Sequence, residues 1–190
     1  MRNHFPDVVV VNFGMAECQP RVVPTWLVRH FTTWDRSSAE MARWYRRELA
    51  PPLWTAVRRW QQVGSGRIGS RTARLAPARF AAEIRRIVEM VRAEARPLVL
   101  VLDIDPPGPR IVHWLPGIDA RVDHYNTVLA GVVRDLGDEE VRFVRSSAIV
   151  RELGFDVALP DGLHRSAVGH RRTAELLAAE VRDWLGTVRR

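Results

Sequence analysis

Two unbroken apolar runs stand out along the chain. One begins at Val8 and ends at Phe13 with a single Asn inside it, and the other is Leu98–Leu102. Neither run alternates apolar with polar residues, a pattern typical of parallel strands covered on both faces. The shorter run Val141–Val144 predicts a third strand.

Helical periodicity fills the spaces between these strands. From Phe80, apolar residues recur at i, i+4, i+7, i+8 and i+11, opposite an Arg/Glu face. The same kind of stripe predicts two more helices, and the full set covers residues 77–96, 119–136 and 167–188. We expect residues 111–117 to be irregular, residues 146–153 to form one or two helical turns, and residues 155–159 to lead into a loop. Alternating helices and strands predict an α/β fold with a parallel sheet.

One segment, residues 22–75, differs from the rest because it is rich in Arg and Trp. It holds five of the seven tryptophans. Helices are expected at about 38–49 and 53–63, with Pro51 and Pro52 between them and a Gly/Ser loop after them. We interpret it as a helical insertion in a single domain, serving either as a lid beside a site or as packing anchored by tryptophans.

The composition of the chain limits which classes of protein it can belong to. The 190 residues fit one domain, and 46% hydrophobic and 27% charged residues are ordinary for a soluble globular chain. The net charge is +7, but the arginines are spread over several segments, which argues against a nucleic-acid patch. The single cysteine excludes an intrachain disulfide. With no apolar run of about 18 residues and no signal-like start, we expect a cytoplasmic protein without a membrane span.

The richest candidate chemistry lies near the end of the chain, in Pro160-Asp161-Gly162-Leu163-His164-Arg165-Ser166. Pro160 and Gly162 indicate a loop, and Ser166 is suited to cap the helix that follows. A carboxylate three residues before a histidine can hold one ring nitrogen and leave the other free as a general base. The alternative is a surface Asp and His in a polar turn.

Further candidates follow the first two strands. Gly14, Ala16, Glu17 and Arg21 come after the first, and Asp103 with Asp105 after the second. Ligands in open α/β sheets bind beyond the carboxyl ends of strands, so these residues are candidates for substrate binding. The paired aspartates have no third ligand spaced near them, and we expect neither a metal nor a cofactor.

Together these motifs resemble a known family. Asp161-x-x-His164 with Gly169-His170 and a long helix resembles the last conserved block of the SGNH (GDSL-type) hydrolases. Gly14, Glu17, Cys18, Pro20 and Arg21 resemble the third block as it reads in some bacterial members. The segment from Leu115 to Asn126 is also similar. The resemblance implies a flavodoxin-like, three-layer parallel sheet and a Ser-His-Asp hydrolase in which His164 is the base and Asp161 orients it.

The chain departs from this family in one important respect. The strand ending in Gly-Asp-Ser and the following oxyanion-hole Gly block have no counterpart, and Ala16 stands where the family usually has an oxyanion-hole Asn. The sheet is therefore expected to lack its first strand-helix units. Ser65, Ser70, Ser146, Ser147 and Ser166 could serve as nucleophiles, but none lies in a strand-turn-helix elbow.

Three functions stay open. The first is an esterase or acyl hydrolase acting on a small molecule, with a nucleophile supplied from elsewhere. The second is a non-hydrolytic enzyme of natural-product assembly, for example in a ring-forming or elimination step that needs a base. The third is an inactive SGNH-like binding subunit. The missing strand would leave the edge of the run from Val8 to Phe13 open. A partner chain, the 22–75 insertion, or residues preceding Met1 could cover it.

Overall fold

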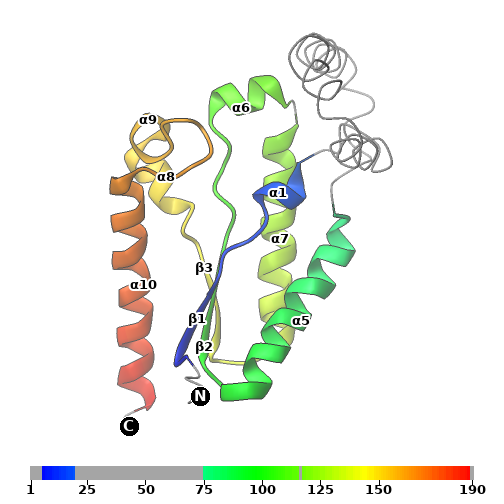
Figure 1. Cartoon of the computed structure of the whole chain (residues 1–190), viewed down its shortest axis with the longest axis vertical. Coiled ribbons are helices and arrows are strands. Elements are labelled where there is room, and N and C mark those ends of the chain that lie inside the picture. The colour runs from blue at the N-terminus through cyan, green and yellow to red at the C-terminus, as the bar shows by residue number, and fades with distance from the viewer. Residues whose placement is uncertain (1–5, 20–74, 116, 189–190) are drawn as a thin grey trace, which may run out of the picture.

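A computed structural model describes residues 6–19, 75–115 and 117–188 of the chain. These residues form an α/β arrangement in which helices alternate with parallel strands (Figure 1). The elements are β1 (Val8–Val11), α1 (Met15–Cys18), α5 (Pro77–Ala95), β2 (Leu98–Leu102), α6 (Pro109–Trp114), α7 (Ile118–Leu136), β3 (Val141–Val144), α8 (Ala148–Leu153), α9 (Phe155–Ala158) and α10 (Ala167–Val188).

The described strands form one parallel sheet in the order β1-β2-β3. Val8 pairs with Leu98 at one end of the β1–β2 ladder, and Val99 pairs with Val141 in the β2–β3 ladder. The central strand β2 is buried at all five positions, as its unbroken apolar run predicts.

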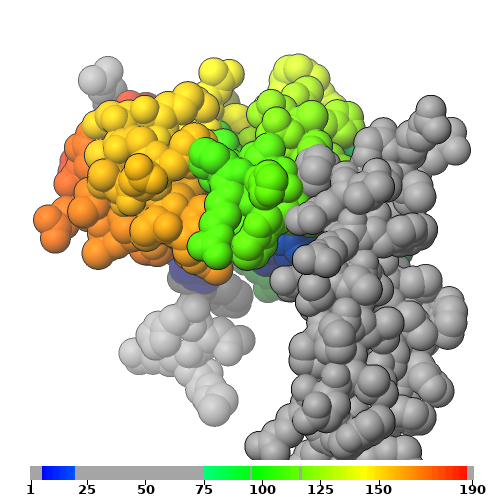
Figure 2. All heavy atoms as spheres, turned by 90° about the horizontal axis from the view of Figure 1, so that it is seen from above, coloured from blue at the N-terminus to red at the C-terminus, as the bar shows by residue number. Residues whose placement is uncertain are grey.

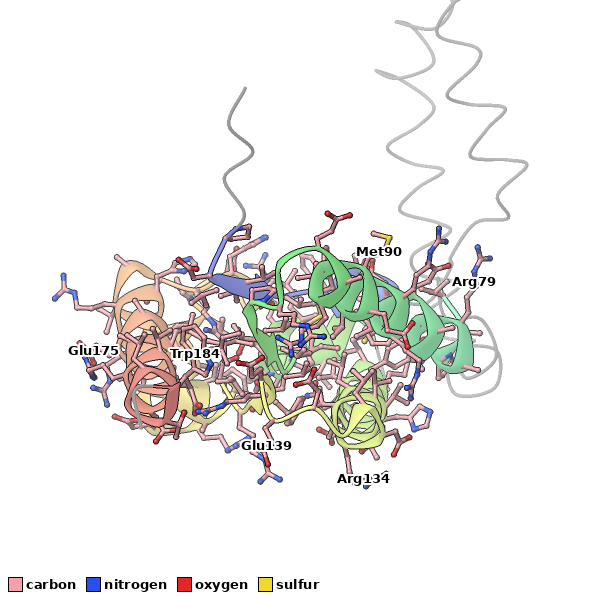
Figure 3. The ribbon with its side chains drawn as sticks, turned by 90° about the horizontal axis from the view of Figure 1, so that it is seen from below. Arg79, Met90, Arg134, Glu139, Glu175 and Trp184 are labelled. Atoms are coloured by element: carbon pink, nitrogen blue, oxygen red, sulfur yellow. The ribbon has the colours of Figure 1, made fainter. Side chains whose placement is uncertain are left out.

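Helices cover the two faces of the sheet. Val99 and Val101 pack into a core with α5 and α7, whereas Leu98, Leu100 and Leu102 pack against α10. Figure 3, a view from the lower end of Figure 1, shows α10 on one side of the sheet and α5 with α7 on the other. Because alternate side chains of a strand point to opposite faces, an all-apolar strand requires these two cores.

The predicted strands and long helices are confirmed, with shifts of one or two residues at their ends. Three connections differ from expectation. Residues 111–117, expected to be irregular, contain most of α6, which starts at Pro109 and buries Ile111. Residues after Gly14, expected to form a turn, make the short helix α1, and residues 155–158 form α9 rather than a plain lead into the loop.

The prediction that β1 is covered on both faces holds only in part, since Val9 and Val11 pack into the core with α5 and α7 and Val8 packs against the α10 core, but Val10 is exposed. Within the described sheet β1 pairs only with β2, and Val10 is 44% exposed while Val11 is buried. The strand also ends at Val11, before Asn12 and the half-exposed Phe13. Val8 and Val10 share the sheet face that α10 covers, but the core beneath α10 is built mainly from β2 residues. In the described sheet β1 is thus an edge strand with one face partly open.

The described residues that border the gap from 20 to 74 meet at one place. The Leu75 backbone N–H donates to the Glu17 carbonyl, at the limit of hydrogen-bond distance (3.5 Å), and the Tyr125 hydroxyl donates to the Leu75 carbonyl. Residues 22–74 of the expected insertion, with its predicted helices, lie outside the described residues. None of the described helices is long and apolar enough to cross a membrane.

Candidate functional site

The candidate residues that the structure describes lie at the carboxyl edge of the sheet, where α1, α6 and α9 follow the strands (Figure 1). The connection from Asp103 to Gly108 lies in the middle of this edge. Gly14 packs against Ile104 of that connection, and the D-x-x-H loop (residues 160–166) packs against Gly108. Figure 2 looks down on this edge and shows the green connection beside the orange loop.

The Asp161 carboxylate organises the D-x-x-H loop. Its Oδ1 accepts hydrogen bonds from the backbone N–H groups of Leu163, at 2.8 Å, and His164, at 2.7 Å. Its Oδ2 lies 2.6 Å from Nδ1 of the His164 ring. The spacing of three residues therefore gives the contact that the sequence predicts, and its role in catalysis stays a prediction.

Hydrogen bonding sets the ionisation of Asp161. The backbone N–H of His164 contributes most, followed by its ring and by the backbone N–H of Leu163, and together they hold the pKa of the Asp161 carboxyl well below its usual range. An ionised carboxylate can only accept, so the proton between the two groups belongs to Nδ1 of His164. Nε2 is then left without a proton in the neutral ring, as a general base requires.

The dyad is open to solvent. The side chain of His164 is 83% exposed and that of Asp161 is 55% exposed. An exposed ion pair contributes little to stability, so the loop needs other anchors. Gly108 N–H donates to the Gly162 carbonyl at 2.9 Å, and Ser166 caps α10 by accepting from Gly169 N–H at 3.1 Å.

Glycine is required on both sides of the contact between the loop and the β2–α6 connection. Gly162 has φ of +86°, a conformation that favours glycine. A β-carbon on Gly108 would lie 2.7 Å from the Gly162 α-carbon. The two backbones can approach closely because Gly108 carries no side chain, whereas a β-carbon on Gly162 would lie 2.9 Å from the Ile111 side chain.

Asp103 is buried, and protein donors surround its carboxylate. Oδ1 accepts from Ser147 N–H at 2.8 Å and from the Ser146 hydroxyl at 3.0 Å, while Oδ2 accepts from the Ser147 hydroxyl at 2.5 Å. These bonds fix the turn between β3 and α8 to the end of β2. The side chain that we predicted to bind substrate is thus engaged with the fold.

Of the candidate residues that follow β1, the structure describes Gly14, Ala16 and Glu17. Gly14 has φ of +137°, and a β-carbon there would overlap the Ile104 side chain. Ala16 is exposed and Glu17 is partly buried on α1. Arg21 lies outside the described residues. Cys18 is fully buried, and burial together with the nearby Glu17 charge raises the pKa of its thiol to about 12, which makes it a poor nucleophile.

A polar network that was not predicted from the sequence lies behind the dyad. It is made of Asp103, Asp105, Ser146, Ser147, Arg165 and Thr173. Its centre is Arg165, whose guanidinium binds Asp105 through two bonds of 2.6 Å. The Asp-x-Asp pattern after β2 and the Arg next to His164 were the available signals. Their pairing could not be read from the sequence because they are 60 residues apart.

No cluster of three His, Cys, Asp or Glu side chains suited to a metal ion occurs among the described residues. Comparison of the chain with protein-family models, curated proteins and solved structures finds no match. The site must therefore be interpreted from its own geometry.

Proposed function

We propose that this chain is an α/β hydrolase of SGNH type that acts on an acyl ester or a related small molecule, with His164 as the general base. The observation that carries the proposal is the 2.6 Å contact between Asp161 Oδ2 and His164 Nδ1 on a loop beyond the carboxyl edge of a parallel sheet. An ionised Asp161 fixes the tautomer, and the exposed ring can take a proton from a nucleophile through Nε2.

The described sheet is compatible with the flavodoxin-like fold that an SGNH-type hydrolase would have. The parallel order β1-β2-β3, with helices on both faces, fits the last three strands of a flavodoxin-like sheet that lacks its first strand-helix units. In such a sheet a further strand would pair beside β1. The exposed Val10 on that edge supports a missing neighbour, which a partner chain would supply together with a nucleophile.

The nucleophile is not found among the described serines. Ser146 and Ser147 bind Asp103, and the Ser166 hydroxyl donates to the Val157 carbonyl at 2.6 Å. Each of these hydroxyls already has a structural role. Hydrolysis therefore needs a serine that lies outside the described residues or belongs to a partner chain.

The contact between Asp161 and His164 also favours a second candidate function. An enzyme that uses His164 only as a base, in an elimination or ring-forming step, requires no serine. The third possibility, an inactive binding subunit, is an outcome of the experiment that follows.

The test uses the tagged chain purified from its own cells, so that bound partners are retained. It is treated with a fluorophosphonate probe and assayed on short-chain p-nitrophenyl esters. We expect serine labelling and ester hydrolysis, both reduced about 100-fold or more in His164→Ala. His170→Ala, which changes an exposed histidine on the first turn of α10, is the matched control and should behave as the wild type.

The outcomes separate the three functions. Full hydrolysis and labelling in His164→Ala would overturn the hydrolase proposal. Absence of labelling and of hydrolysis in the wild type would favour the base-only enzyme or the binding subunit. Those two differ in whether His164→Ala loses function in the cell.

A further inference from the structure

Arg165 follows His164 directly, yet the two side chains lie in opposite surroundings. The Arg165 side chain is 10% exposed, whereas that of His164 is 83% exposed. Because one peptide bond joins the two residues, the anchoring of the Arg165 side chain restricts the backbone that carries the His164 ring. The direction of the candidate base is thus linked to the anchoring of the arginine.

The anchoring of Arg165 is extensive. Nε and Nη2 donate to the two oxygens of Asp105 at 2.6 Å each, and Nη2 also donates to the Ser146 hydroxyl at 2.8 Å. Nη1 donates to the Thr173 hydroxyl. A bidentate arginine–carboxylate pair fixes orientation as well as distance, which a single-point ammonium cannot do.

Two partners of Arg165, Ser146 and Thr173, are themselves held by further hydrogen bonds. The Ser146 hydroxyl donates onward to Asp103, and the Thr173 hydroxyl donates to the Gly169 carbonyl at 2.8 Å. The arginine therefore joins the end of β2, the turn after β3 and the first turns of α10. Among the described residues no buried side-chain nitrogen or oxygen lacks a hydrogen-bond partner. Loss of one member leaves others unpaired at a cost.

We propose that Arg165 is a positioning residue, which through Asp105 holds the D-x-x-H loop so that His164 keeps its Nδ1 on Asp161 and its Nε2 free. The inference deepens the proposed function, on which the catalytic meaning of this orientation rests. The orientation itself is a structural property that can be measured without any activity.

The experiment measures the ring tautomer of His164 by long-range ¹H–¹⁵N NMR on the full chain, with the His164 signals assigned by their absence in His164→Gln. Wild-type neutral His164 should show a protonated Nδ1 and an unprotonated Nε2. Arg165→Lys keeps the charge but loses the bidentate pair. It should shift the neutral ring toward protonated Nε2, the tautomer in which Nε2 can no longer accept a proton and the unprotonated nitrogen is Nδ1. Ester hydrolysis should fall about tenfold in kcat.

Arg172→Lys is the matched control. Arg172 also binds two carboxylates, Glu152 and Glu175, at 2.7 Å, but it is 43% exposed and lies farther along α10. It should change neither the tautomer nor kcat. If Arg165→Lys fails to fold, Thr173→Val replaces it. That substitution removes one acceptor of Arg165 at nearly constant volume and should shift the tautomer in the same direction.

An unchanged His164 tautomer in the folded Arg165→Lys or Thr173→Val variant would overturn the positioning role. A shifted tautomer in a chain that never hydrolyses an ester would uphold the positioning role and reject the hydrolase. The two proposals therefore fail in different ways.

Discussion

Asn126 binds the backbone of Ile104 through both of its polar groups. Its side-chain oxygen accepts from the Ile104 N–H at 2.7 Å, and its amide nitrogen donates to the Ile104 carbonyl at 2.9 Å. The asparagine thus acts like a neighbouring strand for a residue just beyond the end of β2. It ties α7 to the segment that carries Asp103 and Asp105.

Asn126→Ala should destabilise the fold, because both polar groups of the Ile104 backbone lose their partner where the residue is buried. We expect a loss of about 1–3 kcal/mol in the free energy of unfolding, measured by urea titration. Asp123→Ala, at an exposed position on the same helix, should change stability by less than about 0.5 kcal/mol. Equal effects of the two substitutions would show that the two hydrogen bonds between Asn126 and Ile104 contribute nothing to stability.

The Asp161 carboxyl should stay ionised at acidic pH where an ordinary Asp is half protonated. Its folded pKa is lowered, so its contribution to stability is present above about pH 4, the unfolded value, and is lost only as pH falls through the lower folded value. The measurement is the ¹³Cγ chemical shift of Asp161 against pH.

His164→Gln supplies the control for this titration. The variant removes the ring but keeps both backbone N–H donors, of which that of residue 164 contributes most. The Asp161 midpoint should rise but remain below the usual value. A wild-type midpoint near the ordinary pKa of Asp would contradict the hydrogen-bond account.

Gly14→Ala should be more damaging than Gly137→Ala, although both glycines have positive φ. Gly137, at the end of α7, has φ of +61° and open space around it, so the alanine there costs about 1–2 kcal/mol of backbone strain. At Gly14 the φ is +137° and the added carbon also meets Ile104. Urea unfolding should show a loss beyond 2 kcal/mol for Gly14→Ala, and equal losses would refute the packing argument.

Among the described residues one edge of β1 has no paired strand, and this edge should make the isolated chain associate or aggregate. Light scattering coupled to size exclusion is expected to detect this, and Val10→Lys should suppress it, because an edge lysine opposes strand pairing. Met90→Lys is the control, since Met90 is 56% exposed and projects from α5 (Figure 3). A wild-type chain that is monomeric at every concentration and unfolds cooperatively would reject a partner at this edge.

The local features of this protein followed from the sequence. The run Leu98–Leu102 predicted a strand buried on both faces, and the spacing of Asp161 from His164 predicted their contact. Ser166 was predicted to cap α10, and its hydroxyl does so. Each of these depends on residues within a few positions of one another, where backbone geometry alone limits what can meet.

Other features depended on which distant segments meet. The pairing of Arg165 with Asp105 joins residues 60 apart, and that of Asn126 with Ile104 joins residues 22 apart. In the valine run of β1, Val10 is 44% exposed although Val11 is buried, because pairing places this strand at the edge of the described sheet. Local propensity cannot distinguish a central from an edge strand, since the difference is the presence of a neighbour and not a property of the strand itself.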